Sequence, residues 1–173
     1  MGFIEEVILT RSSNRSFAGA PISESTLERI TRAAFAAPSA VNVQPWDLII
    51  VTKRETLDSL GAALPYAKML DKAGSAFVVC GNPSKDDSFA PRYWVQDCSA
   101  MAENILLAAH ALDLGAVWTA VYPESDRIEV VRQILGIPRD RIPLCVIPIG
   151  VIVGTAAEPK DKFNPSAIHR DHW

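Results

Sequence analysis

The sequence is poor in the residues and spacings that mark several common kinds of site. Only three cysteines and three histidines occur among 173 residues, and no two cysteines form a C-x-x-C pair. Cys80, Cys98 and Cys145 are far apart, and each lies in apolar surroundings. An odd number of separated cysteines favours buried free thiols in a reducing compartment over a disulfide framework or a metal site.

Long apolar runs and a strong charge of one sign are also lacking. No apolar run approaches the roughly 20 residues that a membrane-spanning helix needs. The first ten residues, MGFIEEVILT, have no basic start and contain Glu5 and Glu6, which is unlike a secretory signal peptide. The net charge is only −3, which argues against nucleic acid or an anionic membrane as the main partner. These absences predict a cytoplasmic protein in which any anion site is local.

Helical and strand patterns alternate along the chain without an internal repeat, which predicts a single domain over 1–173. A first helix covers residues 3–8. Further helices are expected over 22–37, 54–64, 93–115 and 125–136, buried strands over 47–52, 75–81 and 144–153, and a short strand or turn over 116–121. Local signals refine these limits: Ser25 and Glu28 could form a capping box, Gly115 would end the longest helix, and Pro148 would interrupt the last strand.

The longest predicted helix, 93–115, is alanine-rich and apolar around much of its girth. A central core helix in a monomer would explain this composition, but a domain this small rarely surrounds such a helix completely. A dimer interface over part of the helix is therefore expected. The last segment, 154–173, is polar and is either a disordered tail or an arm. Its three large apolar residues favour an arm that packs on another surface: Phe163, Ile168 and Trp173.

Basic residues gather near both ends of the chain. RSSNR, residues 11–15, should follow the first helix as an extended turn in which Arg11 and Arg15 can face one phosphate, with Ser12 and Ser13 supplying hydroxyls. Lys160 and Lys162 alternate on an extended segment and so point the same way. The two pairs could converge on one dianion, although the sequence alone leaves this open.

A third polar stretch lies between a helix and a strand, in AAFAAPSAVNVQPWDLIIV at 33–51. Pro38 breaks the helix, and Ser39, Asn42 and Gln44 follow before Trp46 opens the strand. Polar residues in such a loop are either turn-formers or ligand contacts, and Gln44 and Trp46 can be purely structural.

Together these motifs resemble the FMN-dependent nitroreductase family. R-x-S-x-R-x-F occurs here as RSSNRSF, and A-P-S-x-x-N-x-Q-P-W as APSAVNVQPW. QDCSAMAENILLAAHALDLGAVWTAVYP resembles the family's central helix and its G-x-x-x-W segment, and ILGIPRDRIPLCVIPIGV its final core strand. The end of the chain, from EPKDKFN to IHRDHW, is similar to the arm of the shorter members. The resemblance thus covers nearly the whole chain through four ordered motifs.

The resemblance implies an α+β, three-layer fold with a central, mainly antiparallel sheet flanked by helices. The long central helix would lie at the interface of a homodimer with two shared flavin sites, and the arm 154–173 of each subunit would pack on the other. FMN would be the cofactor and NADH or NADPH the electron donor. FMN in place of FAD also agrees with the absence of a G-x-G-x-x-G element.

The resemblance also assigns site residues. Arg11, Ser12, Ser13 and Arg15 would hold phosphate and ribityl oxygens, and Lys160 and Lys162 would complete the phosphate clamp. The family usually has arginine at the second lysine, so Lys162 offers a point charge in place of a fork. The remaining assignments are contacts from the partner subunit (Pro38, Ser39, Ala40, Asn42), contacts along the flavin ring, with a backbone N–H near N5 (Trp118, Thr119, Ala120, Val121), and a contact at the ring edge and nicotinamide nucleotide (Lys68).

The implied activity is ping-pong hydride transfer from NAD(P)H through flavin to a nitroaromatic, a quinone or a similar small acceptor. No protein nucleophile or metal is expected, since the flavin carries the chemistry. The chain is short for the family, which suggests a reduced lid and an open pocket. The alternative is an FMN-storage or FMN-sensing module with negligible turnover; the intact ring-facing segment favours the enzyme. The physiological acceptor and the choice between NADH and NADPH stay open.

Overall fold

The computed structural model describes residues 2–173, and its strands form one antiparallel sheet. The strand order is β1-β2-β5-β3. The short strand β4 also pairs with β5, on the same edge as β3 but at a different stretch of β5. The strands are β1 (Trp46–Val51), β2 (Ser75–Gly81), β3 (Leu114–Ala116), β4 (Thr119–Ala120) and β5 (Ile142–Val151).

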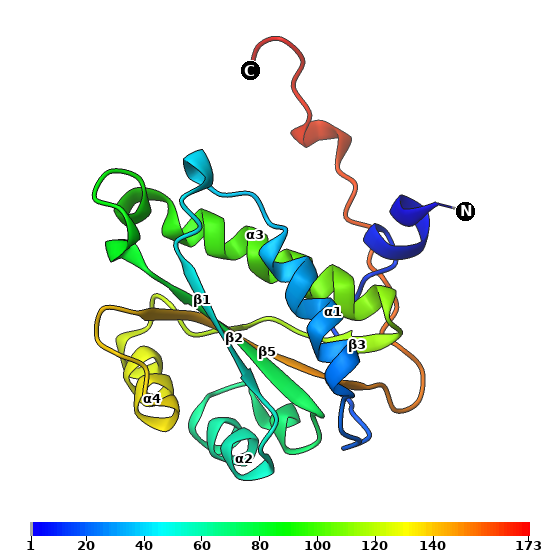
Figure 1. The fold of residues 1–173 in the computed structure, drawn as a ribbon. Coiled ribbons are helices and arrows are strands. Elements are labelled where there is room, and N and C mark those ends of the chain that lie inside the picture. The colour runs from blue at the N-terminus through cyan, green and yellow to red at the C-terminus, as the bar shows by residue number, and fades with distance from the viewer. Residues whose placement is uncertain (1) are drawn as a thin grey trace.

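Helices cover both faces of the sheet, as Figure 1 shows. On one face lie α1 (Glu24–Phe35) and α3 (Ala90–Ala111), and on the other α2 (Arg54–Ala63) and α4 (Ser125–Leu135). Two clusters of buried side chains fill the spaces between the layers: one includes Ile30 and Ile105, and the other includes Leu57 and Val131. The expected three-layer α+β architecture with an antiparallel sheet and a long central helix is confirmed.

Strand β5 lies in the middle of the sheet and is continuous, so the predicted interruption at Pro148 is wrong. Proline cannot donate to a strand ladder, and a central strand normally excludes it. The neighbouring strand explains the exception. β3 pairs with 149–151 and β4 with 145–146, so Pro148 faces the break between them. Its carbonyl accepts a 3.4 Å hydrogen bond from the N–H of Val117 within that break.

Two predicted helix limits are also wrong, for local reasons. The cap of α1 is Ser23, whose Oγ accepts from the N–H of Thr26 at 3.2 Å, while Glu28 pairs with Arg32 one turn along instead of forming a capping box. Helix α3 ends at Ala111, before Gly115, because Asp113 takes the left-handed conformation at φ 58. Gly115 instead belongs to β3.

Other expectations agree with the structure. Gly136 ends α4 in the left-handed conformation, and Leu27, Ile30 and Ala34 are the buried residues of α1. All three cysteines are buried and free. Within residues 2–173, no helix has the length and apolar character needed to cross a membrane.

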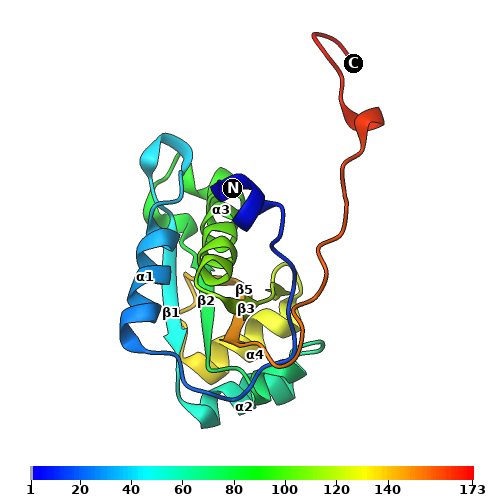
Figure 2. The same cartoon turned by 90° about the vertical axis from the view of Figure 1, so that its right-hand side faces the viewer.

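The N-terminal turn and the root of the C-terminal arm lie near the same end of α3. The N-terminal turn η1 (Ile4–Ile8) packs on α3, and the arm 154–173 leaves the body and extends away from it (Figure 2). The arm is exposed along its whole length, including its short helical turn η5 (Pro165–Ala167), and Trp173 is fully exposed. The arm therefore makes few contacts within its own chain.

Candidate functional site

The two basic segments from opposite ends of the chain meet around one cavity. The cavity has a volume of about 340 Å³, and its walls combine residues of the N-terminal turn with residues of the arm. These are Arg11, Ser12, Ser13, Arg15, Ala157, Glu158, Lys160 and Lys162. The lining thus has four cationic side chains, two hydroxyls and one acid, Glu158. Such a set suits a phosphate-like dianion.

Asn14 joins the two halves of this cavity. Its side chain is buried, and its Oδ1 accepts a 2.8 Å hydrogen bond from the backbone N–H of Ala157 at the root of the arm. Its Nδ2 donates to the backbone oxygen and to the Oγ of Ser12, both at 3.3 Å. One amide thus fixes the root of the arm and the position of a cavity hydroxyl.

Helix α3 supports the N-terminal half of the cavity. Arg11 lies 3.7 Å from Glu103, and the Thr10 hydroxyl lies 2.8 Å from Nε2 of His110. Since that hydroxyl donates to the carbonyl of Glu6 at 2.5 Å, it accepts from His110. Partial burial, and then the charge of Arg11, lower the pKa of His110 below its ordinary value, so the ring is neutral near pH 7.

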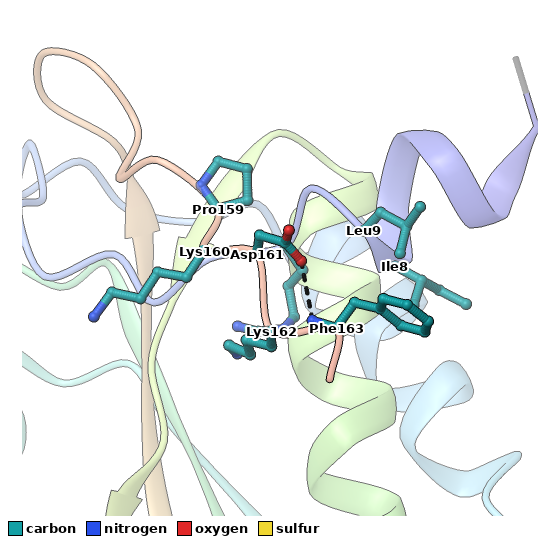
Figure 3. A pocket seen from close by; sticks show the side chains of 8 residues that line it. Ile8, Leu9, Pro159, Lys160, Asp161, Lys162 and Phe163 are labelled. Carbon is teal, nitrogen blue, oxygen red and sulfur yellow. Dashed lines mark hydrogen bonds between the residues drawn. The ribbon is translucent and has the colours of Figure 1, made fainter. Parts of the chain in front are cut away.

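The two arm lysines lie beside a second, larger hollow, shown in Figure 3. This hollow of about 550 Å³ lies between the arm and η1. It is lined by four apolar residues (Ile8, Leu9, Pro159, Phe163) and four charged ones (Arg11, Lys160, Asp161, Lys162). Asp161 accepts a 3.0 Å hydrogen bond from the N–H of Phe163, which shapes the arm between the lysines and the aromatic ring. Apolar side chains thus stand exposed next to the basic cavity.

A third cavity, of about 170 Å³, continues from Arg15 toward β4. Trp118, Thr119 and Ala120 line it together with Pro65, Tyr66, Val117 and Arg127. Val121 does not: its side chain is fully buried, and its N–H donates to the Leu144 carbonyl at 3.0 Å. Because Arg15 lines both this cavity and the 340 Å³ cavity, the two are neighbours.

The loop of Pro38, Ser39, Ala40 and Asn42 lies away from these cavities. The N–H of Ala40 donates to Asp97 of α3 at 3.0 Å, and about 9 Å of helix separates Asp97 from Glu103, the ion-pair partner of Arg11. Inside the loop, Ser39 accepts from the N–H of Gln44 at 2.9 Å, and Asn42 has φ 59. The loop and the basic cavity therefore sit on different parts of α3 within one chain (Figure 1).

Lys68 is also separate from the other candidate residues. It is exposed and lines a different cavity with Asp58, Gly61, Ala62 and Asp71, at the contact of α2 with the turn η3 (Lys68–Asp71). No group of three or more possible metal ligands (His, Cys, Asp, Glu) occurs within the described residues 2–173.

Sequence reasoning missed three supporting residues. Asn14 stood inside the RSSNR motif, and the preference of asparagine for local backbone hydrogen bonds was its only signal. Asp97 is a buried acid within an apolar helix, and acids are rarely buried unless they are paired with a hydrogen-bond donor or a charge. Arg127 carried no signal, because its place beside Trp118 arises only from the packing of α4 against the sheet.

Comparison with known proteins gives one family. The model of the nitroreductase family matches residues 8–64 and 58–151. A protein of Archaeoglobus fulgidus named "Putative NADH dehydrogenase/NAD(P)H nitroreductase" is 42% identical over 170 residues, which are 97% of each chain. A protein of the same name from Methanothermobacter thermautotrophicus is 43% identical over 97% of this chain and 86% of its own.

Solved structures agree in fold. A protein of that same name from Parabacteroides distasonis is 43% identical, with a TM-score of 0.92 over the whole of both chains. An FMN-dependent nitroreductase from Clostridium difficile is 26% identical, with a TM-score of 0.86 over 99% of both chains. The likeness therefore extends through the arm as well as the sheet.

Proposed function

Because the chain belongs to the nitroreductase family, we propose that it is an FMN-dependent NAD(P)H oxidoreductase that reduces small acceptors such as nitroaromatics or quinones. The observation that carries the proposal is the meeting of RSSNR with Lys160 and Lys162 around one cavity. The name of the Clostridium difficile relative supports FMN as the cofactor. The names of the archaeal relatives support NAD(P)H as the electron donor.

The residues present fit FMN. The 340 Å³ cavity offers the charge and the hydroxyl donors that a terminal phosphate and a ribityl chain require. The adjoining cavity offers Trp118 and the backbone of β4 as a surface for a flat ring. Arg15, which lines both, would reach the junction of the two parts. When bound, FMN supplies hydride transfer between NAD(P)H and the acceptor.

The protein's own part is binding, orientation and access. Arg11, Lys160 and Lys162 neutralise the phosphate, and Asn14 holds the arm against the N-terminal turn so that these charges stay together. The main chain at Thr119 and Ala120 is held in the sheet by β5, which gives the ring end of the site a rigid wall. Preorganised donors of this kind need little rearrangement on binding.

We further propose that the protein is a homodimer and that residues 1–173 form one domain whose arm, 154–173, packs on the partner subunit. Within one chain, Asn42 and its neighbours line none of the cavities around Arg11 and Arg15. A second subunit could bring that loop to the cavity and could cover the exposed Phe163, Ile168 and Trp173.

The test uses the purified protein. It should be yellow and should release FMN, identified by chromatography after denaturation. Addition of NADH or NADPH without oxygen should bleach the yellow colour within seconds. Release of mainly FAD, or of no flavin, contradicts the cofactor assignment. FMN that is bound but stays oxidised with both donors would favour the storage module over the enzyme.

A further inference from the structure

We infer that Arg127 is a substrate-recognition residue, and that the preferred acceptors are small flat molecules carrying a carboxylate or a similar anionic group. The inference rests on the proposed function, since it names the acceptor class for the same site. It comes from the 170 Å³ cavity, in which Arg127 lies with Arg15, Trp118 and Tyr66.

Arg127 has a free charge inside this cavity. It is half-buried, and its Nη1 makes one long hydrogen bond, 3.4 Å, to the carbonyl of Ala120. No carboxylate lines the cavity, and no ion pair of Arg127 occurs within residues 2–173. In α4 itself, Arg132 is paired with Glu129 at 3.1 Å. The guanidinium of Arg127 thus keeps most of its donors for a ligand.

The position of Arg127 does not serve its own helix. Arg127 lies in the first turn of α4 (Ser125–Leu135), where the helix dipole favours anions and disfavours cations. A cation at this place therefore costs α4 some stability.

Arg15, the other cation that lines this cavity, is assigned to the cofactor. Arg15 also lines the 340 Å³ cavity with Arg11, Lys160 and Lys162, and the proposed function assigns it to FMN. Arg127 lines only the ring-side cavity and is not needed for the phosphate. It therefore remains available to whatever binds after the cofactor.

The walls of the cavity set the shape of a ligand that binds there beside the flavin ring. The side chains of Trp118 and Tyr66 supply aromatic walls, and Tyr66 is 83% exposed. A planar ring with one anionic group matches both the walls and the charge.

The first experiment compares two acceptors that differ only in charge, 4-nitrobenzoate and 4-nitrobenzamide, with the FMN-loaded enzyme. We expect kcat/KM to be at least about 10-fold higher for the nitrobenzoate, as a charge-assisted pair to Arg127 would give. Arg127→Gln should bring this ratio close to one. Arg29→Gln, which removes an equal charge from the exposed side of α1, should keep the wild-type ratio.

The inference is overturned if the wild-type ratio is near one, if Arg127→Gln leaves it unchanged, or if Arg29→Gln lowers it equally. A second measurement needs no turnover: calorimetric titration of the FMN-loaded protein with benzoate and with benzamide. We expect benzoate to bind at least about 10-fold more tightly, and this preference to vanish in Arg127→Gln. Charge-selective binding without any NAD(P)H oxidation would refute the proposed function and keep the anion site; turnover without charge selectivity would do the reverse.

Discussion

Arg15 is the residue on which the two ends of the candidate site depend, because it alone lines both the basic cavity and the ring-side cavity. Its guanidinium makes no ion pair within residues 2–173, so its donors are free for a ligand. We expect Arg15→Ala to weaken FMN binding roughly 10- to 100-fold, the value of one charge-assisted contact. Titration of apoprotein with FMN, followed by flavin fluorescence, measures the change.

The matched control for Arg15→Ala is Asp161→Asn on the arm. Asp161 accepts from the N–H of Phe163, and asparagine keeps this acceptor, so the shape of the arm is preserved. FMN affinity should stay within about two-fold of wild type, since a lost surface charge contributes little. An equal loss in both variants would mean that the arm acts through its folding and not through phosphate contacts.

Asn14 provides a second prediction at this scale. Asn14→Ala removes the link to Ala157 and leaves Lys160 and Lys162 on an arm without its fixed root. FMN binding should weaken by about 10-fold, because Lys162 then loses its fixed position. Adding Lys162→Ala to Asn14→Ala should weaken FMN binding much less than Lys162→Ala does alone, because both changes act on the contact between Lys162 and the phosphate. Double-mutant cycles on FMN dissociation constants test this coupling. Strictly additive losses would contradict it, and Asn164→Ala, farther along the arm, should change little.

The residues of the site were only partly predictable from sequence. Basic and hydroxyl side chains at 11–15 and 160–162 indicated an anion by their chemistry, and the structure brings them to one cavity. That meeting depends on a buried amide and on the path of the chain after β5, which no local pattern encodes. Within one chain, Lys68 lines a different cavity and the Val121 side chain is buried, so the assignment of these two residues to the flavin stays a prediction.

The elements were predicted better than their ends. Buried strands such as Ser75–Gly81 are continuous apolar runs, and the helices have clear apolar faces, so hydrophobic burial alone determines them. Ends depend on single backbone conformations, which several residue types can supply. Ser23 and Ser25 were both suitable caps for α1, and Asp113 took the left-handed position expected of Gly115.

The contact between β2 and α3 carries a prediction at this scale. A Cβ on Gly81 would lie 2.0 Å from Cε3 of Trp94, so the ring lies directly on the strand backbone. Gly81→Ala should therefore lower the free energy of unfolding by about 1–3 kcal/mol through overpacking. Urea denaturation measures it. Since Trp94→Leu removes the obstructing ring, the double variant should lose less than the two single variants together; full additivity would contradict the close packing.

The exposed apolar side chains suggest how whole molecules associate. Phe163, Ile168 and Trp173 are exposed on the arm, and Phe3, Ile4, Ile8 and Leu9 are exposed on and beside η1. A monomer rarely leaves so many large side chains in water close together. The sequence indicated such a surface through the composition of the arm and the long helix, whereas the position of the partner depends on contacts between two chains.

Complementation between two inactive chains tests whether each flavin site is shared. In the proposed dimer, Arg15 of one subunit and Asn42 of the other surround the same cofactor. Arg15→Glu reverses a charge at the clamp, and Asn42→Asp adds an anion while asparagine and aspartate both tolerate the left-handed backbone at φ 59. Each variant should be inactive as a homodimer.

In the heterodimer of these two chains, one site collects both lesions and the other collects neither. Isolated heterodimers carrying two different affinity tags should therefore regain roughly half of the wild-type activity, because distant, independent sites contribute separately. Sites contained within single subunits would each carry one lesion, and the mixture would stay inactive. That result, or a fully active monomer by light scattering, would refute the shared site and would require the loop of Asn42 to act only in folding its own chain.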